Sequence, residues 1–333
     1  MALTPWARAA NASVELRKPR ALRPGDTVAL ITPSTYVTDP LDIEAAERMA
    51  RHFGLRPRWG ANSRKRGGYL AGTIEERVAD LHDAFRDPEV KGVFCTRGGY
   101  GAPQLLAHLD YDLIRRNPKV LAGYSDITAL HLAIQAKAGL VTFHAPTLLS
   151  PFTDYSQRYF RQAVFEIQPS QVIQNPPEPN PLRPAHPVRA IRPGKARGRL
   201  LGGNLTLISS LMGTPYEPDT RGRLFFLEDI GEEPYRIDRM LTQLRLAGKF
   251  DQCAGVVVGE CVDCNQRDYK PSFRGNSWTL HEVLDQILGG LRVPVLSGLL
   301  IGHTEDQATL PVGVLAEMDA EAGTLTLLES GVI

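Results

Sequence analysis

Short apolar runs alternate with helical patterns over the first 150 residues, and this alternation restricts the fold more than any other feature. Apolar residues recur at helical spacing over 41–53, 74–85 and 127–136. Apolar runs that are joined in this way are typical of a parallel sheet covered by helices on both faces. We therefore predict an α/β domain whose strands are 27–32, 92–96, 120–124 and 140–143.

The composition changes after this region. Eight of the chain's 25 prolines lie between Gln168 and Pro193. Because proline has no amide donor and a fixed φ, such a stretch cannot form a helix or a central strand. We predict an extended linker over 168–194 between an N-terminal domain, 1–167, and a C-terminal domain, 195–333. Strands in the second domain are expected at 198–201, 224–227, 255–259 and 295–301, helices at 204–212 and 235–247, and short strands in 308–328.

Charge and hydropathy exclude several classes of partner. Lys plus Arg number 38 against 37 Asp plus Glu, so the chain has no bulk attraction for nucleic acid or anionic membranes. No segment approaches the roughly 20 apolar residues of a membrane helix. Residues 1–23 lack the apolar core of a signal peptide. We expect a cytoplasmic protein with neither a nucleic-acid nor a membrane partner.

Four cysteines are too few to stabilise 333 residues by disulfides, which also favours reducing surroundings. Cys261 and Cys264 have the spacing of a metal or redox pair, but Cys95 and Cys253 lie far apart in the sequence. Buried thiols without a function are the simpler interpretation. We expect neither a metal nor a cofactor.

A glycine-rich loop, 96–101, follows the second predicted strand. Its glycines allow the backbone to approach a ligand and to direct N–H groups at an anion. The phosphate-binding pattern GxxxxGK[ST] is absent from it. A plain tight turn is the alternative.

Ser125 lies where the third predicted strand runs into a helix. A serine at such a junction is exposed on a sharp turn, and the next amide points at developing negative charge. The nucleophile-elbow pattern GxSxG is incomplete, because Ile127 replaces its second glycine. The alternative is that Ser125 serves only as a helix N-cap.

A serine nucleophile needs a base and an acid that orients it. Of the eight histidines, only His144 and His303 directly follow predicted strands. Glu228 offers a carboxylate at the end of another strand, and the order serine, acid, histidine is one of the known triad orders. The alternative for Glu228 is a salt bridge to Arg236 or Arg239.

Taken together, these motifs resemble the LD-carboxypeptidases, a family of serine peptidases. They run in family order through nearly the whole chain, and one departure is Ala145, where the family usually has glycine. The matching segments are 97–101, 123–128, 143–146, 202–205, 213–215, 226–229 and 302–303.

The resemblance implies a role for each site residue. Ser125 is the expected nucleophile, His303 the general base and Glu228 its orienting acid. The backbone N–H groups of Asp126 and Gly99 are expected to hold the oxyanion.

The resemblance also implies a flavodoxin-like N-terminal domain and a smaller, β-rich, swivelling C-terminal domain, with the site between them. Family members are commonly cytoplasmic homodimers. They act on a small peptide, releasing the terminal D-alanine of murein tetrapeptide in cell-wall recycling.

Three other functions must also be weighed against the sequence. A second branch resembles the microcin C immunity peptidases, which cleave an aminoacyl–nucleotide amide. An aromatic residue that stacks on the base would favour that branch, but we expect Trp278 to be a packing residue. A non-catalytic solute-binding module, which is usually exported, is the second possibility. The third is a glutamine amidotransferase, which needs cysteine at position 125.

Overall fold

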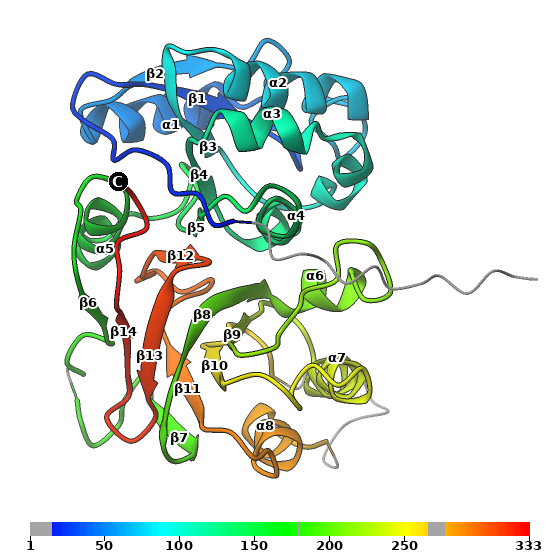
Figure 1. Cartoon of the computed structure of the whole chain (residues 1–333), viewed down its shortest axis with the longest axis vertical. Coiled ribbons are helices and arrows are strands. Elements are labelled where there is room, and N and C mark those ends of the chain that lie inside the picture. Colours follow the sequence, from blue (N-terminus) through cyan, green and yellow to red (C-terminus); the bar gives the residue numbers. More distant parts are fainter. Residues whose placement is uncertain (1–14, 179, 266–276) are drawn as a thin grey trace, which may run out of the picture.

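Two lobes, each built on its own sheet, make up the chain (Figure 1). The computed structural model describes residues 15–178, 180–265 and 277–333. The first sheet has six strands in the order β12-β5-β4-β3-β1-β2, and the second has eight in the order β6-β14-β13-β8-β9-β10-β11-β7. The predicted α/β class, with a parallel-sheet lobe and a β-rich lobe, is confirmed.

Five consecutive parallel strands form most of the first sheet. Their spatial order, β2-β1-β3-β4-β5, is that of flavodoxin-like folds, as expected. The strands are β1 (Thr27–Ile31), β2 (Arg56–Trp59), β3 (Val90–Cys95), β4 (Val120–Gly123) and β5 (Thr142–His144). The sequence did not reveal β2, because this edge strand alternates exposed and half-buried positions and is rich in arginine.

Helices accompany these strands, three of them at the predicted places, whereas the helices over 111–116 and 154–164 were not predicted. Thr73 caps the second helix through a capping box with Glu76, which satisfies two backbone donors. The helices are α1 (Pro40–His52), α2 (Ile74–Arg86), α3 (Tyr111–Arg116), α4 (Thr128–Ala138) and α5 (Asp154–Val164), with 3₁₀ turns η1 (Ala102–His108) and η2 (Ser125–Ile127).

The second sheet has a parallel centre and antiparallel edges. Its parallel strands are β8 (Lys195–Asn204), β9 (Arg223–Glu228), β10 (Gly255–Gly259) and β11 (Val295–Leu299). Two further strands, β13 (Leu315–Asp319) and β14 (Thr324–Leu327), extend it on the β8 side. The helices of this lobe are α6 (Leu205–Ser210), α7 (Pro234–Leu246) and α8 (Leu280–Leu288); α7 and α8 lie to the right of the sheet in Figure 1.

The segment predicted as a linker also builds this sheet. Two short proline-free stretches near its ends form β6 (Gln171–Ile173) and β7 (Arg189–Arg192), which lie at opposite edges. The prolines between them restrict the segment to edge positions, as expected, but its ends are not merely a connector.

The chain returns to the first lobe near its end. Strand β12 (Leu310–Val312) pairs antiparallel with β5, and the backbone N–H of Ile333 donates to the carbonyl of Pro19 at 2.9 Å. The two lobes are therefore tied together by the chain's last 25 or so residues as well as by the proline-rich segment. Within the described residues, no helix combines the length and apolar character needed to cross a membrane.

Candidate active site

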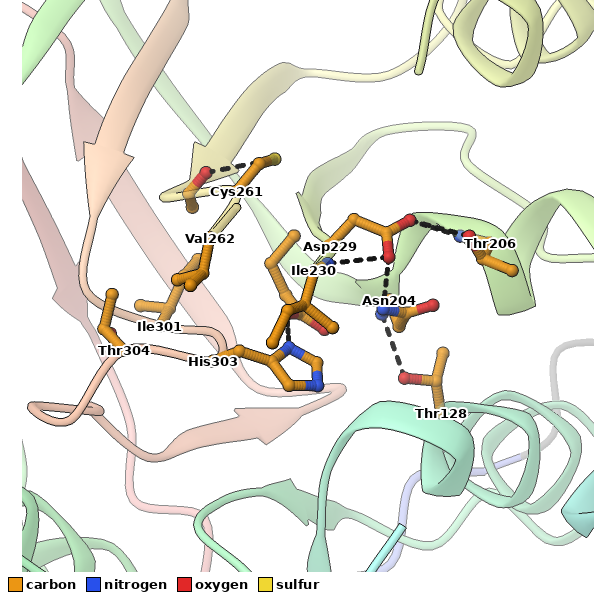
Figure 2. Close-up of polar contacts among 12 residues, drawn as sticks. Thr128, Asn204, Thr206, Asp229, Ile230, Cys261, Val262, Ile301, His303 and Thr304 are labelled. Carbon is orange, nitrogen blue, oxygen red and sulfur yellow. Dashed lines mark hydrogen bonds and ion pairs between the residues drawn. The ribbon is translucent and has the colours of Figure 1, made fainter. Parts of the chain in front are cut away.

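The carboxyl ends of β9 and β11 bring an acid and a histidine together. Strand β9 ends at Glu228, and the loop that follows β11 carries His303. The Nδ1 of His303 lies 2.7 Å from Oε2 of Glu228, whose side chain is completely buried. The carboxylate therefore accepts the Nδ1–H and leaves Nε2 for other chemistry. Figure 2 shows the hydrogen bond leaving the ring of His303 at Nδ1.

The alternative of a salt bridge between Glu228 and an arginine is wrong. Arg236 pairs with Glu232 at 3.4 Å, and the guanidinium of Arg239 lies over the ring of Tyr235. Next to the histidine, Gly302 leaves the room that the pair needs, because a Cβ there would lie 2.6 Å from Oε2 of Glu228.

Ser125 sits on a strained turn between β4 and α4. Its φ is 64°, and among the described residues only Asp263 is another non-glycine with positive φ. Such backbone costs about 1–3 kcal/mol and is concentrated at functional sites. No side-chain capping bond is made at the start of η2 or α4, so the N-cap alternative is wrong.

The incomplete elbow pattern has a local explanation. A Cβ at Gly123 would lie 3.0 Å from Cγ1 of Ile127, so the first glycine already makes room for the isoleucine. The sharp turn therefore forms without a second glycine.

The glycine-rich loop packs directly on Ser125. A Cβ at Gly98 would lie 3.0 Å from Cβ and 3.3 Å from Oγ of Ser125. Gly99 has a φ of 110°, and a Cβ there would lie 2.2 Å from Oγ1 of Thr35. Tyr100 donates its N–H to the same oxygen at 3.1 Å. A larger residue at 98 would collide with Ser125 and one at 99 with Thr35, so the plain-turn alternative does not account for these contacts.

The side chain of Asp126 holds the glycine-rich loop in place through hydrogen bonds. Its Oδ2 accepts hydrogen bonds from Oγ of Ser34 at 2.6 Å and from the N–H of Ala102 at 2.7 Å. Burial raises the pKa of Asp126, and these hydrogen bonds oppose the rise. Arg77 adds a bond from Nη1 to the carbonyl of Gly101 at 3.0 Å.

Sequence reasoning missed these supporting residues: Ser34, Thr35 and Arg77. One available signal was the polar Ser34-Thr35 pair at the end of β1, since β1 and β3 flank the switch point of a flavodoxin-like sheet. For Arg77, the signal was a charged residue on the buried face of α2, where it is only 2% exposed.

The second lobe lies against the serine turn. The rings of Tyr124 and His303 are 4.7 Å apart between centroids. Burial, above all, raises the pKa of Tyr124, so the residue preceding Ser125 is a neutral phenol. The structure therefore places the histidine beside the immediate neighbour of Ser125.

His144, the other histidine that follows a strand, has a different environment. It is completely buried, and its Nε2 donates to the carbonyl of Ile301 at 2.7 Å. Burial lowers the pKa of His144, which keeps the ring neutral. Its successor, Ala145, has negative φ, so alanine is sterically allowed where the family usually has glycine.

Asp229 organises the neighbouring backbone. Its two carboxylate oxygens accept hydrogen bonds from the side chain of Asn204 at 3.0 Å, the N–H of Ile230 at 2.9 Å, and both N–H and Oγ1 of Thr206 at 2.9 Å (Figure 2). Burial, and secondarily the charge of Glu228, raises the pKa of Asp229 to about 6. Asn204 also donates its backbone N–H across to Oγ1 of Thr128 at 2.9 Å.

The cysteine pair lies next to this acid. The N–H of Val262 donates to the carbonyl of Asp229 at 3.1 Å. A hydrogen bond with Cys264, together with burial, raises the pKa of Cys261 well above that of a free thiol. Within the described ranges, no group of three His, Cys, Asp or Glu residues has metal-binding geometry. Among the residues that the structure describes, the pair therefore has no further ligands of the kind that a zinc site requires.

A flavodoxin-like lobe that carries a strained serine, closed by a second lobe that carries a histidine–carboxylate pair, defines the class of serine hydrolases. The sequence models of the LD-carboxypeptidase N-terminal and C-terminal domains match residues 28–145 and 197–318. A "Probable murein peptide carboxypeptidase" from Bacillus subtilis (strain 168) is 41% identical over 324 residues, covering 95% of each chain. The chain therefore belongs to the LD-carboxypeptidase family, and it is a serine carboxypeptidase by class.

Two solved structures show how far the likeness extends. A muramoyltetrapeptide carboxypeptidase from Oxalobacter formigenes matches with a TM-score of 0.76 and 31% identity, covering 90% of this chain and 97% of that one. The microcin C7 self-immunity protein MccF, in complex with glutamyl sulfamoyl guanosine, matches with a TM-score of 0.84 and 27% identity, covering 95% and 99%. Family membership rules out the solute-binding module and the amidotransferase.

Proposed function

We propose that this enzyme hydrolyses an LD-peptide bond and releases the terminal D-alanine of murein tetrapeptide, in the cytoplasm, as part of cell-wall recycling. The observation that carries the proposal is the 2.7 Å bond between His303 and the fully buried Glu228, next to the strained turn of Ser125. The substrate follows from the activities for which the Bacillus subtilis relative and the Oxalobacter formigenes enzyme are named.

In this mechanism Ser125 is the nucleophile. Nε2 of His303 takes the proton from Oγ while the oxygen attacks the carbonyl carbon of the LD bond. Glu228 holds the ring in the required tautomer and stabilises the imidazolium that forms. The imidazolium then protonates the departing amine of D-alanine. Water, deprotonated by the same histidine, hydrolyses the acyl-enzyme and frees the serine.

We assign the oxyanion hole to the backbone N–H groups of Gly99 and Asp126. Two observations support this assignment. The loop packs on Ser125 through Gly98, and the N–H of Gly99 donates to none of the described residues. Loss of one preorganised donor at such a position lowers kcat by a factor of about 10²–10³.

The fold alone does not separate peptide from aminoacyl–nucleotide substrates, and one observation favours the second. Trp278, which we expected to be a packing residue, is 51% exposed, so packing leaves much of its surface open to solvent. An exposed indole is available for stacking on a base, and the MccF structure carries glutamyl sulfamoyl guanosine. An aminoacyl–nucleotide amide is therefore the second candidate substrate for the same triad.

One assay separates the two substrates. Purified enzyme is incubated with L-Ala-D-Glu-diaminopimelate-D-Ala, with the same peptide ending in L-alanine, and with glutamyl sulfamoyl adenosine. We expect alanine release from the D-terminated peptide alone. Cleavage of the nucleoside conjugate with no alanine release would contradict the murein assignment and support the second candidate.

We also propose that the enzyme is a homodimer, on the basis of the family resemblance. Light scattering coupled to size-exclusion chromatography is expected to give twice the mass of the 36.7 kDa chain. A monomer mass at micromolar concentration would contradict this proposal.

A further inference from the structure

The proposed triad is divided between the two lobes, so its geometry depends on how the lobes are held. Ser125 belongs to the first lobe, whereas Glu228 and His303 belong to the second. A misplacement of about 1 Å at a reacting centre costs on the order of 10²-fold in rate. The enzyme therefore needs contacts that fix the serine turn against the strand ends of the second lobe.

One such contact joins Thr128 to Asn204. Thr128 is the first residue of α4, three residues after Ser125, and its Oγ1 accepts the backbone N–H of Asn204 at 2.9 Å. Asn204 ends β8 and pairs in register with Glu228 on β9. Both partners of this bond are buried, at 0% and 3% exposure. The bond therefore links the helix after the nucleophile to the strand end that holds the acid.

The residues around this hydrogen bond allow the two lobes to come close together. A Cβ at Gly203 would lie 2.5 Å from Oγ1 of Thr128, so only glycine allows the lobes to meet here. The side chain of Asn204 is held at both ends. Its amide N–H donates to Asp229 at 3.0 Å (Figure 2). Its Oδ1 accepts the N–H of Leu207 at 3.2 Å. The residue whose backbone N–H donates to Thr128 is therefore held in place by hydrogen bonds within the second lobe.

A second contact joins His144 to the strand end that leads to the base. His144 ends β5 in the first lobe, and its Nε2 donates to the carbonyl of Ile301, two residues before His303. Both residues are completely buried. A neutral ring has a single N–H, so the bond to Ile301 also fixes its tautomer.

We propose that Thr128 and His144 are positioning residues, which hold the nucleophile's lobe in register with Glu228 and His303 through two buried hydrogen bonds between the lobes. This inference rests on the proposed function, because it takes Ser125 and His303 as the reacting pair. Neither residue needs to touch the substrate in this role. Their removal should lower the rate of serine attack more than it weakens substrate binding.

The test measures the reactivity of Ser125 without a peptide. Diisopropyl fluorophosphate reacts when Oγ attacks phosphorus, fluoride leaves and the hydroxyl proton passes to His303. Thr128→Val keeps the shape of the side chain and removes the acceptor, whereas Thr128→Ser keeps the hydroxyl. His144→Leu removes the donor, whereas His144→Gln keeps an N–H in reach of Ile301.

We expect inactivation to slow by on the order of 10²-fold in Thr128→Val and His144→Leu. The matched Thr128→Ser and His144→Gln variants should stay within about threefold of wild type. In peptide hydrolysis, the loss should fall on kcat, with KM nearly unchanged. Circular dichroism and thermal unfolding monitor the fold of each variant.

Each outcome has a definite meaning. Folded Val and Leu variants that react as fast as their matched controls would overturn the inference. If Thr128→Val does not fold, Thr128→Ala takes its place, and the comparison of His144→Leu with His144→Gln tests the inference by the same criterion. A wild-type enzyme that neither reacts with the reagent nor cleaves any peptide would instead refute the proposed function.

Discussion

The three buried or nearly buried histidines differ in the acceptor that each ring meets. His303 donates to the carboxylate of Glu228, whereas Nε2 of His144 and of His131 donates to a backbone carbonyl. A carboxylate stabilises an imidazolium strongly, and a neutral carbonyl in a buried site does not compensate for burying the charge. Of the three, His303 is therefore suited to accept a proton during turnover.

This difference predicts which histidine is the base. We expect His303→Ala to lower kcat about as much as loss of the nucleophile, because the two residues act as a unit. His144→Gln should retain most of the activity. Steady-state kinetics of the two variants checks the assignment, and the reverse ranking would make His144 the base.

The strain at Ser125 predicts a difference in stability between two inactive variants. Glycine adopts a φ of 64° without the steric cost that alanine carries there. We expect Ser125→Gly to be more stable than Ser125→Ala by about 1 kcal/mol. Urea unfolding of the two proteins measures the difference. A less stable glycine variant would show that the turn is not strained.

His131 predicts part of the pH dependence of stability. Burial lowers its pKa from 6.5 to about 3, so between these values the unfolded chain binds a proton that the folded protein does not. The free energy of unfolding therefore falls as pH falls through this window.

The contribution of His131 to this loss of stability is measured by comparing wild type with His131→Gln. From pH 7 to pH 5, we expect wild type to lose about 2 kcal/mol more free energy of unfolding than His131→Gln, at about 1.4 kcal/mol per pH unit below 6.5. Urea titrations at both pH values give the two losses. Equal losses would mean that His131 is protonated in the folded protein.

At the scale of elements, strand ends carry the site. β3, β4, β9 and β11 each end in a loop that supplies part of it, and short apolar runs in the sequence identify all four strands. This is why Ser125, Glu228 and His303 could be selected from the sequence. Strand β2 escaped notice because its edge position leaves it without an apolar run.

The sequence could not show which residues of the site form hydrogen bonds with one another. Arg236 and Arg239 on α7 lie much nearer to Glu228 in the sequence, yet its partner is 75 residues away, because β9 and β11 end at the same edge of one sheet. The bond between Asn204 and Thr128 likewise spans both lobes. Such contacts depend on strand order, which local patterns do not encode.

On the scale of the whole molecule, the lobes are not independent. β12 comes from the C-terminal part of the chain and covers the edge of β5, where Thr142, Phe143 and His144 are all completely buried. Without β12, this edge would expose unpaired backbone groups and apolar side chains to solvent.

We therefore predict that a fragment of residues 1–168 lacks a cooperative fold, although it contains every parallel strand of the first sheet. Circular dichroism during urea titration is expected to show a broad transition or aggregation. The full-length chain is the control. A sharp transition in the fragment would show that the first lobe is stable without β12.

The central claim is that Ser125 acts as a nucleophile under the control of Glu228 and His303 on the other lobe. Its most direct test is the initial rate of D-alanine release from murein tetrapeptide by wild type, Ser125→Ala and Glu228→Gln, all shown to be folded. We predict that Ser125→Ala lowers kcat by on the order of 10⁶ and Glu228→Gln by on the order of 10⁴. Near wild-type turnover by the folded Ser125→Ala enzyme would contradict the claim.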